Sequence, residues 1–245
     1  MKFAVTYYVL RVEHITRPYR LAVVADFHNG DERAVFRAVK EENPDLVLLP
    51  GDFLHKAGEV EHGFALLRLL AAHYPTYCSL GNHESRCGMR DLAERVAETG
   101  ALLLDNAVAR HGELTLGGLS TGYTVGMRQG RTLPTPPPDR RFLSDFAKEE
   151  GCRILLCHHP EYYAPYIREK DIPLTVSGHA HGGQWELGGR AIFAPGQGLF
   201  PRYTAGLYED RLLVSRGLAV GPPFIPRMNN PRELAIVDLW SAENV

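Results

Sequence analysis

The chain has 245 residues, of which 44% are hydrophobic and 23% charged, and its formal net charge at pH 7 is −2. These values are typical of a globular protein and exclude a disordered, collagen-like or coiled-coil chain. The near-neutral charge disfavours a protein that binds nucleic acid through a basic surface. We expect one domain over residues 1–245.

The sequence predicts a cytoplasmic protein. No apolar run reaches the ~18–20 residues that a transmembrane helix requires. The N-terminal segment alternates apolar and polar residues from Phe3 to Val9, which predicts a strand and not a signal peptide. The cysteines form no CxxC pair, and we expect free thiols in a reducing compartment at Cys78, Cys87, Cys152 and Cys157.

Strands alternate with helices through the first hundred residues. Apolar runs predict strands at Leu21–Asp26, Asp45–Pro50 and Pro75–Leu80. Helical spacing of apolar residues predicts helices at Asp31–Glu42, Val60–Tyr74 and Met89–Thr99. This alternation indicates an α/β fold.

The second half of the chain has shorter elements. Short strands are expected in Ala101–Leu119, and the Gly-, Pro- and Arg-rich segment Gly122–Pro138 is expected to be a long loop. A helix is predicted at Asp139–Glu150, followed by strands at Arg153–Cys157 and Ile172–Ser177. The remaining predicted strands are short: Trp185–Leu187, Ala191–Ala194, Ala205–Tyr208, Leu212–Ser215 and Leu234–Leu239.

Five predicted strands each end close to a side chain that can bind a metal. These side chains are Asp26, Asp52, Asn82, His158 and His179. Ligands of open α/β sheets bind outside the carboxyl ends of the strands, so we expect the five to converge. Six of the eleven histidines occupy the same turns: His28, His83, His158, His159, His179 and His181. Most of these pieces alone are weak signals, and the strongest is Gly178-His179-Ala180-His181-Gly182-Gly183, where small residues let the backbone approach a metal closely. Their order and their places at strand ends together indicate a metal site.

The sequence resembles the calcineurin-like metallophosphoesterase family. The five motifs of that family are matched by Asp26-Phe27-His28, Gly51-Asp52, Gly81-Asn82-His83-Glu84, His158 and Gly178-His179-Ala180-His181. The extension Gly182-Gly183-Gln184 resembles the bacterial branch with the GHxHGGQ pattern, which includes phosphodiesterases and some nucleotide-lipid pyrophosphatases.

The resemblance implies an α/β sandwich of two mixed β-sheets flanked by helices, and a centre of two divalent metal ions. It assigns Asp26, His28, Asp52 and His181 to the first ion. It assigns Asp52, Asn82, His158 and His179 to the second, so that Asp52 bridges both. A ligand set of imidazoles, carboxylates and one amide, without thiolate, favours Mn²⁺, with Fe or Zn²⁺ as alternatives.

The resemblance also implies the reaction, in which a metal-bridging hydroxide attacks a phosphoester. Asp52 is catalytic as the bridge, and His83 lies near the leaving group as general acid or transition-state stabiliser. Asn82 and His83 are expected to contact the substrate. Asn29, Arg128 and Arg131 are weaker candidates, since Asn29 is also placed to cap a helix and the arginines to lie on the surface.

The leading interpretation is a phosphohydrolase that acts on phosphodiester or pyrophosphate bonds. A phosphomonoesterase acting on proteins or small molecules is the alternative within the same chemistry. A non-catalytic scaffold with this fold is a second alternative, which the complete ligand set disfavours. The expected partner is a phosphoester substrate, nucleic acid is disfavoured by the charge, and no pattern points to an oligomeric state.

Overall fold

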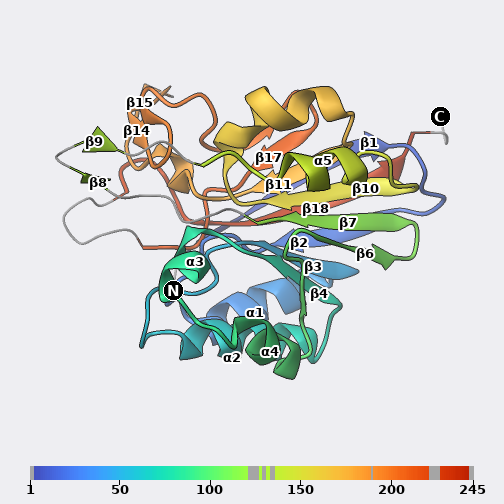
Figure 1. The fold of residues 1–245 in the computed structure, drawn as a ribbon, viewed down its shortest axis with the longest axis horizontal. Coiled ribbons are helices and arrows are strands. Elements are labelled where there is room, and N and C mark those ends of the chain that lie inside the picture. The colour runs from blue at the N-terminus through green and yellow to red at the C-terminus, as the bar shows by residue number, and fades with distance from the viewer. Residues whose placement is uncertain are drawn as a thin grey trace.

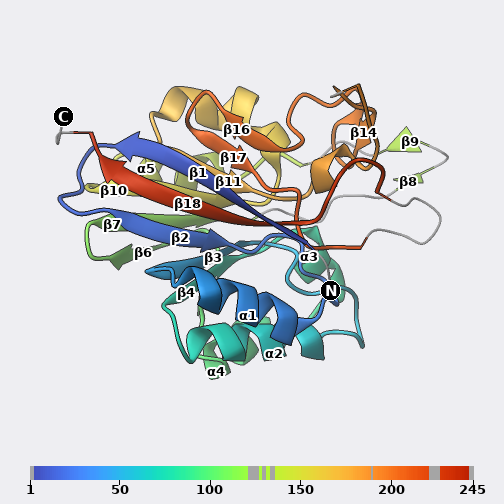
Figure 2. The ribbon, with the colours of Figure 1, turned by 180° about the vertical axis from the view of Figure 1, so that it is seen from behind.

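The computed structural model describes residues 3–120, 127–128, 131–132, 136–188, 190–220 and 227–242. Two six-stranded sheets pack face to face, with helices on both outer faces (Figure 1; seen from behind in Figure 2). Both sheets contain parallel and antiparallel neighbours. The expected α/β sandwich of two mixed sheets flanked by helices is therefore confirmed.

The first sheet has the strand order β1-β18-β2-β3-β4-β5. Its strands are β1 (Ala4–Val12), β18 (Glu233–Ser241), β2 (Tyr19–Val23), β3 (Leu46–Pro50), β4 (Thr76–Ser79) and β5 (Leu102–Leu103). Strands β2 to β5 are parallel to one another, while β18 is antiparallel to β2 and parallel to β1. The last strand of the chain thus lies between the first two.

The second sheet has the order β16-β17-β11-β10-β7-β6. Its strands are β16 (Gly206–Tyr208), β17 (Leu212–Val214), β11 (Leu174–Ser177), β10 (Cys152–Cys157), β7 (Leu114–Leu119) and β6 (Ala107–His111). The four central strands are parallel, and the two edge strands are antiparallel to their neighbours. Three further strand pairs are β8 (Met127–Arg128) with β9 (Arg131–Thr132), β12 (Glu186–Leu187) with β13 (Arg190–Ala191), and β14 (Phe193–Ala194) with β15 (Gly198–Leu199).

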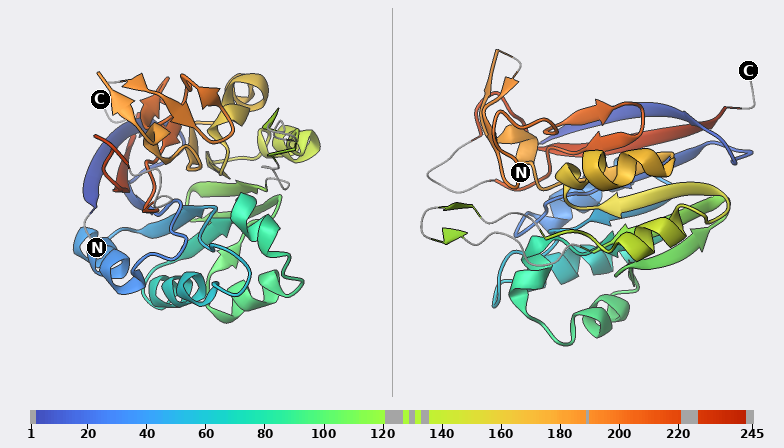
Figure 3. Two further views of the ribbon diagram at one scale, coloured as in Figure 1. Left: turned by 90° about the vertical axis from the view of Figure 1, so that its left-hand side faces the viewer. Right: turned by 45° about the horizontal axis from the view of Figure 1, so that its top comes forward.

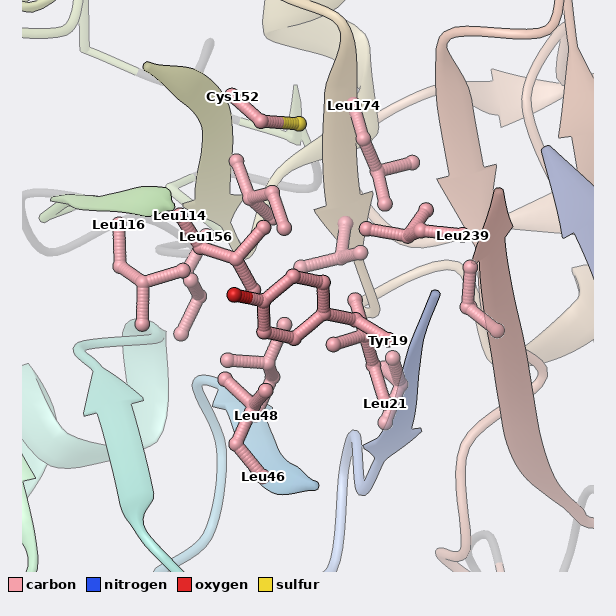
Figure 4. Packing of buried hydrophobic residues seen from close by; sticks show 14 of the residues in the cluster. Tyr19, Leu21, Leu46, Leu48, Leu114, Leu116, Cys152, Leu156, Leu174 and Leu239 are labelled. Carbon is pink, nitrogen blue, oxygen red and sulfur yellow. The ribbon is translucent and has the colours of Figure 1, made fainter. Parts of the chain in front are cut away.

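The space between the sheets is filled by aliphatic side chains and Tyr19 (Figure 4). Successive side chains of β2 point to opposite faces of the sheet, as they do in any strand. Leu21 and Val23 join the core between the sheets, whereas Ala22 contacts the helical layer. Both faces of β2 are therefore covered, which explains why this strand reads as a continuous apolar run.

Helices cover the outer faces of both sheets. The first sheet is covered by α1 (Glu32–Glu42), α2 (Glu61–Ala71) and α4 (Leu92–Glu98). The second is covered by α5 (Arg140–Phe146) and a helical segment of three short turns, η1 (Pro160–Tyr162), η2 (Tyr163–Ile167) and η3 (Arg168–Lys170). A last short turn, η4 (His181–Gly183), follows β11.

Several local expectations need correction. The segment after β4 was expected to be a turn, but Asn82–Cys87 forms helix α3, which begins where the Glu84 carboxylate accepts the N–H of Gly81. Within the expected loop 122–138, β8 and β9 pair with each other, while 121–126, 129–130 and 133–135 lie outside the described residues. All four cysteines are free thiols, as predicted. In the described part of the chain no helix is both long and apolar enough to cross a membrane.

Candidate metal centre

Strands from both sheets end at one edge of the sandwich, which faces the viewer in the left panel of Figure 3. Asp26 and Asp52 follow strands of the first sheet, and His158 and His179 follow strands of the second. Nε2 of His158 lies 3.2 Å from Oδ2 of Asp52. The carboxylate of Asp26 accepts the N–H of His179 at 3.0 and 3.1 Å. The predicted convergence therefore joins the two sheets.

Six of the seven expected ligands, all except Asn82, form two adjacent groups. Within each group the ligand atoms lie within 4.8 Å of one another, and the groups are Asp26, His28 and His181, and Asp52, His158 and His179. Nε2 of His28 is 3.8 Å from Oδ2 of Asp52, which places Asp52 between the groups. Each group comes from one of the two sets that the resemblance assigns to an ion. Their role as ligands remains a prediction.

The backbone at this edge is unusual. Five of the seven expected ligands have a positive φ, between 48° and 64°: Asp26, His28, Asp52, His179 and His181. Residues other than glycine rarely adopt this backbone conformation, which costs about 1–3 kcal/mol per residue. The surrounding structure must stabilise it, and such strain concentrates at functional sites.

Glycines allow the carboxylates to lie against the backbone. A Cβ atom at Gly81 would overlap with Oδ1 of Asp52, and a Cβ at Gly217 would overlap with Oδ2 of Asp26. A Cβ at Gly178 would lie 2.6 Å from the same oxygen of Asp26. This close approach explains the glycines that precede Asn82 and His179 in the motifs.

Hydrogen bonds from the surrounding chain orient the group around Asp52. Nδ1–H of His158 donates to the carbonyl of Pro50 at 2.9 Å, which leaves Nε2 of His158 as the free nitrogen. Oδ1 of Asp52 accepts the N–H of His83 at 2.8 Å. The buried Glu84 accepts the N–H groups of Asp52, Leu54 and Gly81, each at 2.8 Å. The turn that carries Asp52 is thus fixed by side chains from α3.

The buried carboxylates and histidines at this edge shift one another's pKa values. Burial raises the pKa of Asp26 to about 6, against the opposing charge of His158. Burial acts to lower the pKa of His158, but the carboxylates of Asp52, Asp26 and Glu84 raise it to about 10. Burial alone would raise the pKa of Asp52, and His158 holds it well below its usual range. The histidines of the other positions stay neutral, because burial lowers the pKa of His28 to about 3 and holds that of His179 well below its usual range.

The donor atoms fit divalent metal ions. Nε2 of His179 and Oδ1 of Asn82 are buried and have no hydrogen-bond partner among the described residues. Buried polar atoms without partners are rare, and a bound ion would give such an atom a partner. Imidazole, carboxylate and amide oxygen together suit Mn²⁺, Fe or Zn²⁺.

His83 lies beside this cluster with its ring fixed. Its Nδ1–H donates to the carbonyl of His55, so Nε2 is the nitrogen left for chemistry. Nε2 lies 3.9 Å from Oδ2 of Asp52, and the ring meets His28 edge-on at 4.3 Å between centroids. Sequence reasoning missed His55. Its one signal was its position three residues after Asp52, because the turn that presents Asp52 also carries it.

A cavity of ≈ 410 Å³ opens next to His83. Its wall is largely apolar, with Phe27, Pro195, Leu218, Ala219 and Val220 around the histidines. Asn29 also lines it, and the Asn29 amide donates to Glu59 at 2.7 Å. Helix α1 is capped by Asp31 instead of Asn29. Arg128 and Arg131 fall on β8 and β9, but their side chains lie outside the described residues.

Comparison with known proteins decides the family. The model of the family described as calcineurin-like phosphoesterase matches residues 19–183, a segment that holds all seven expected ligands. This chain belongs to the calcineurin-like phosphoesterase family. Calcineurin-like phosphoesterases are metal-dependent hydrolases of phosphoric esters, and the strand-end cluster is the part of this chain that fits such chemistry.

Curated calcineurin-like phosphoesterases resemble most of the chain. The uncharacterised metallophosphoesterase YkuE of Bacillus subtilis is 29% identical over 78% of this chain and 66% of its own length. The uncharacterised metallophosphoesterase Cj0846 of Campylobacter jejuni is 24% identical over 94% of this chain and 61% of its own length. The phosphodiesterase YaeI of Escherichia coli is 27% identical over 91% of this chain and 82% of its own length. The chain thus spans less than two thirds of the length of the first two relatives.

Proposed function

We propose that this chain hydrolyses phosphodiester or pyrophosphate bonds at a centre of two divalent ions, with Mn²⁺ favoured over Fe or Zn²⁺. The observation that carries the proposal is the meeting of Asp26 with His179 and of Asp52 with His158 across two sheets. A non-catalytic scaffold has no need of such strained, buried and unpartnered donors.

The proposed roles are those that the family resemblance implies, and the positions of the side chains support them. Asp26, His28, Asp52 and His181 hold the first ion, and Asp52, Asn82, His158 and His179 the second. When bound, the ions supply Lewis acidity that activates water and neutralises the charge on the phosphoryl oxygens. His83 donates a proton from Nε2 to the leaving oxygen, since its Nδ1–H is held by the carbonyl of His55.

The cavity supports a diester in preference to a monoester. It lies beside His83 and offers room for a group esterified to the phosphate. Its described lining contains no Lys or Arg that would compensate the second negative charge of a monoester. The similarity to a relative named as a phosphodiesterase, YaeI, supports the same preference.

The experiment uses chelated protein with Mn²⁺ added back. We expect kcat/KM for bis(p-nitrophenyl) phosphate to exceed that for p-nitrophenyl phosphate at least tenfold, and the chain to bind two Mn²⁺. Faster cleavage of the monoester would establish the phosphomonoesterase alternative. Two bound ions without cleavage of any mono-, di- or pyrophosphate ester would establish the scaffold.

We also propose that the protein functions in the cytoplasm. The support is that Cys78, Cys87, Cys152 and Cys157 are all free and three of them are buried, which suits a reducing compartment. Cell fractionation with an antibody against the chain tests this, and recovery in a membrane or secreted fraction would contradict it.

A further inference from the structure

A second carboxylate lies next to the group around Asp52. Glu161 belongs to the turn η1 that follows His158, and its side chain is 17% exposed. Nδ1 of His159 lies 2.9 Å from Oε1 of Glu161, and the fully buried His159 ring thereby fixes the carboxylate. The same oxygen lies 4.0 Å from Nε2 of His179. That separation is too long for a hydrogen bond.

The separation does fit two ligands of one ion. Metal–ligand bonds of ~2.0–2.2 Å allow two donor atoms of one ion to lie up to about 4 Å apart. The donor pairs of the expected centre have the same spacing: 3.2 Å for His158 and Asp52, 3.8 Å for His28 and Asp52, and 3.9 Å for His181 and Asp26. The donor atoms of His159, Glu161 and His179 also lie within 4.8 Å of one another.

His179 points a free nitrogen toward this carboxylate. Nε2 of His179 is buried without a hydrogen-bond partner among the described residues, although Oε1 of Glu161 is nearby. A nitrogen and an oxygen held apart in this way are arranged for a cation between them, because a direct hydrogen bond would draw them about 1 Å closer.

Gly196 keeps the space between the two side chains open. A Cβ atom at this position would overlap with Oε1 of Glu161 and lie 3.0 Å from Nε2 of His179. The segment that carries Gly196 lies between β14 and β15, far from both residues in sequence. Only glycine leaves this place free for an ion.

Charge gives the same result. The second ion, as assigned above, would be held by two imidazoles that must give up any extra proton to bind it, a neutral amide and a half share of the Asp52 carboxylate. A further carboxylate would balance a divalent charge in a buried site, where uncompensated charge is costly.

From these observations we infer that Glu161 is an additional ligand of the second ion, on the side of His179, and that Gly196 provides the room for it. The inference rests on the proposed two-ion centre. It adds an oxygen ligand from outside the five motifs and assigns a role to a glycine in the hairpin of β14 and β15.

The test measures metal binding and not turnover. Chelated wild-type protein and Glu161→Gln are titrated with Mn²⁺ by calorimetry, and bound metal is counted after gel filtration. We expect the wild type to bind two ions. Glu161→Gln should keep the first and bind the second at least tenfold more weakly, because Gln retains the acceptor for His159 but loses the charge.

Two glycine variants form a matched pair. Gly196 and Gly198 have similar positive φ angles, 72° and 76°, and a Cβ at Gly198 would meet nothing within 4 Å. Both alanine variants therefore place a side chain at an unfavourable positive φ, and only Gly196→Ala fills the space. We expect Gly196→Ala to lose the second ion and Gly198→Ala to keep both. Equal loss in both variants would attribute the effect to backbone strain and overturn the role of Gly196.

Spectroscopy separates a ligand from a residue that only positions His179. With Co²⁺ in place of Mn²⁺, the visible absorption of the second ion should change in Glu161→Gln, because its ligand set changes. An unchanged spectrum or two ions at wild-type affinity in Glu161→Gln would overturn the inference and leave the two-ion centre intact. A wild type that binds a single ion would overturn the two-ion centre as well.

Discussion

The carboxylate of Asp26 accepts the backbone N–H of His179, although the two residues are 153 positions apart in the chain. Asp26 follows β2 of the first sheet and His179 follows β11 of the second. A proposed ligand of the first ion thus holds the backbone of a proposed ligand of the second. We therefore expect the two proposed ion positions to be coupled through this hydrogen bond as well as through Asp52.

Asp26 should have separable roles in metal binding and in the fold. Asp26→Asn keeps an oxygen that accepts the N–H of His179 but lacks the charge, so we expect loss of the first ion with a small change in melting temperature. Asp26→Ala also leaves the buried N–H unpaired, which costs ~1–3 kcal/mol. Metal analysis and thermal melts of the apo proteins check this. Equal melting temperatures for the two variants would contradict the structural role.

Asp52→Asn should remove the shared ligand. We expect activity to fall by at least about 10²-fold and both ions to bind more weakly, because a single carboxylate serves both positions. Metal content after gel filtration and kcat with bis(p-nitrophenyl) phosphate are the measurements. Asp105→Asn, at an exposed position, is the control and should match the wild type. Loss of one ion alone from Asp52→Asn would show that the carboxylate does not bridge.

His83→Asn should lower the rate while metal binding is kept. A general acid contributes ~10²–10⁴-fold, and the expected ligand set is complete without His83. The loss should shrink for esters with acidic leaving groups such as nitrophenolate, because these leave without a proton. His73→Asn, on the surface, is the matched control. Loss of metal from His83→Asn would show that His83 is a metal ligand. An equal loss of rate on all esters would indicate an electrostatic role.

Glu84→Ala should lower the free energy of unfolding of the apo protein. The variant leaves the N–H groups of Asp52, Leu54 and Gly81 without their acceptor, and each buried unpaired group costs ~1–3 kcal/mol. Glu84→Gln retains one acceptor oxygen and should lose less. Urea unfolding of the apo proteins gives the free energies. Glu94→Ala, on an exposed face of α4, should have the unfolding free energy of the wild type. A wild-type unfolding free energy for Glu84→Ala would contradict the stabilising role of the Glu84 hydrogen bonds.

The sequence by itself determined the elements and the ligand candidates. Strands such as β3 and β10 are continuous apolar runs because both of their faces are buried, and such runs are readable without a structure. Polar residues directly after them, Asp52 and His158, stand out against that pattern. Sequence reasoning missed helix α3 for two reasons. Its first turn depends on the hydrogen bond that the N–H of Gly81 donates to the Glu84 carboxylate, and the segment is too short to show helical periodicity.

Tertiary structure alone decided what surrounds the centre. The carbonyl that orients His83 comes from His55, and backbone groups leave no mark in an amino-acid pattern. Glu161 and Gly196 meet only because β10 and the hairpin of β14 and β15 lie at the same edge of the sandwich. Distances of a few ångströms between segments far apart in sequence arise from the packing of two sheets. The sequence predicts which side chains follow the strands. The packing of the two sheets decides which of these side chains lie close enough to share an ion.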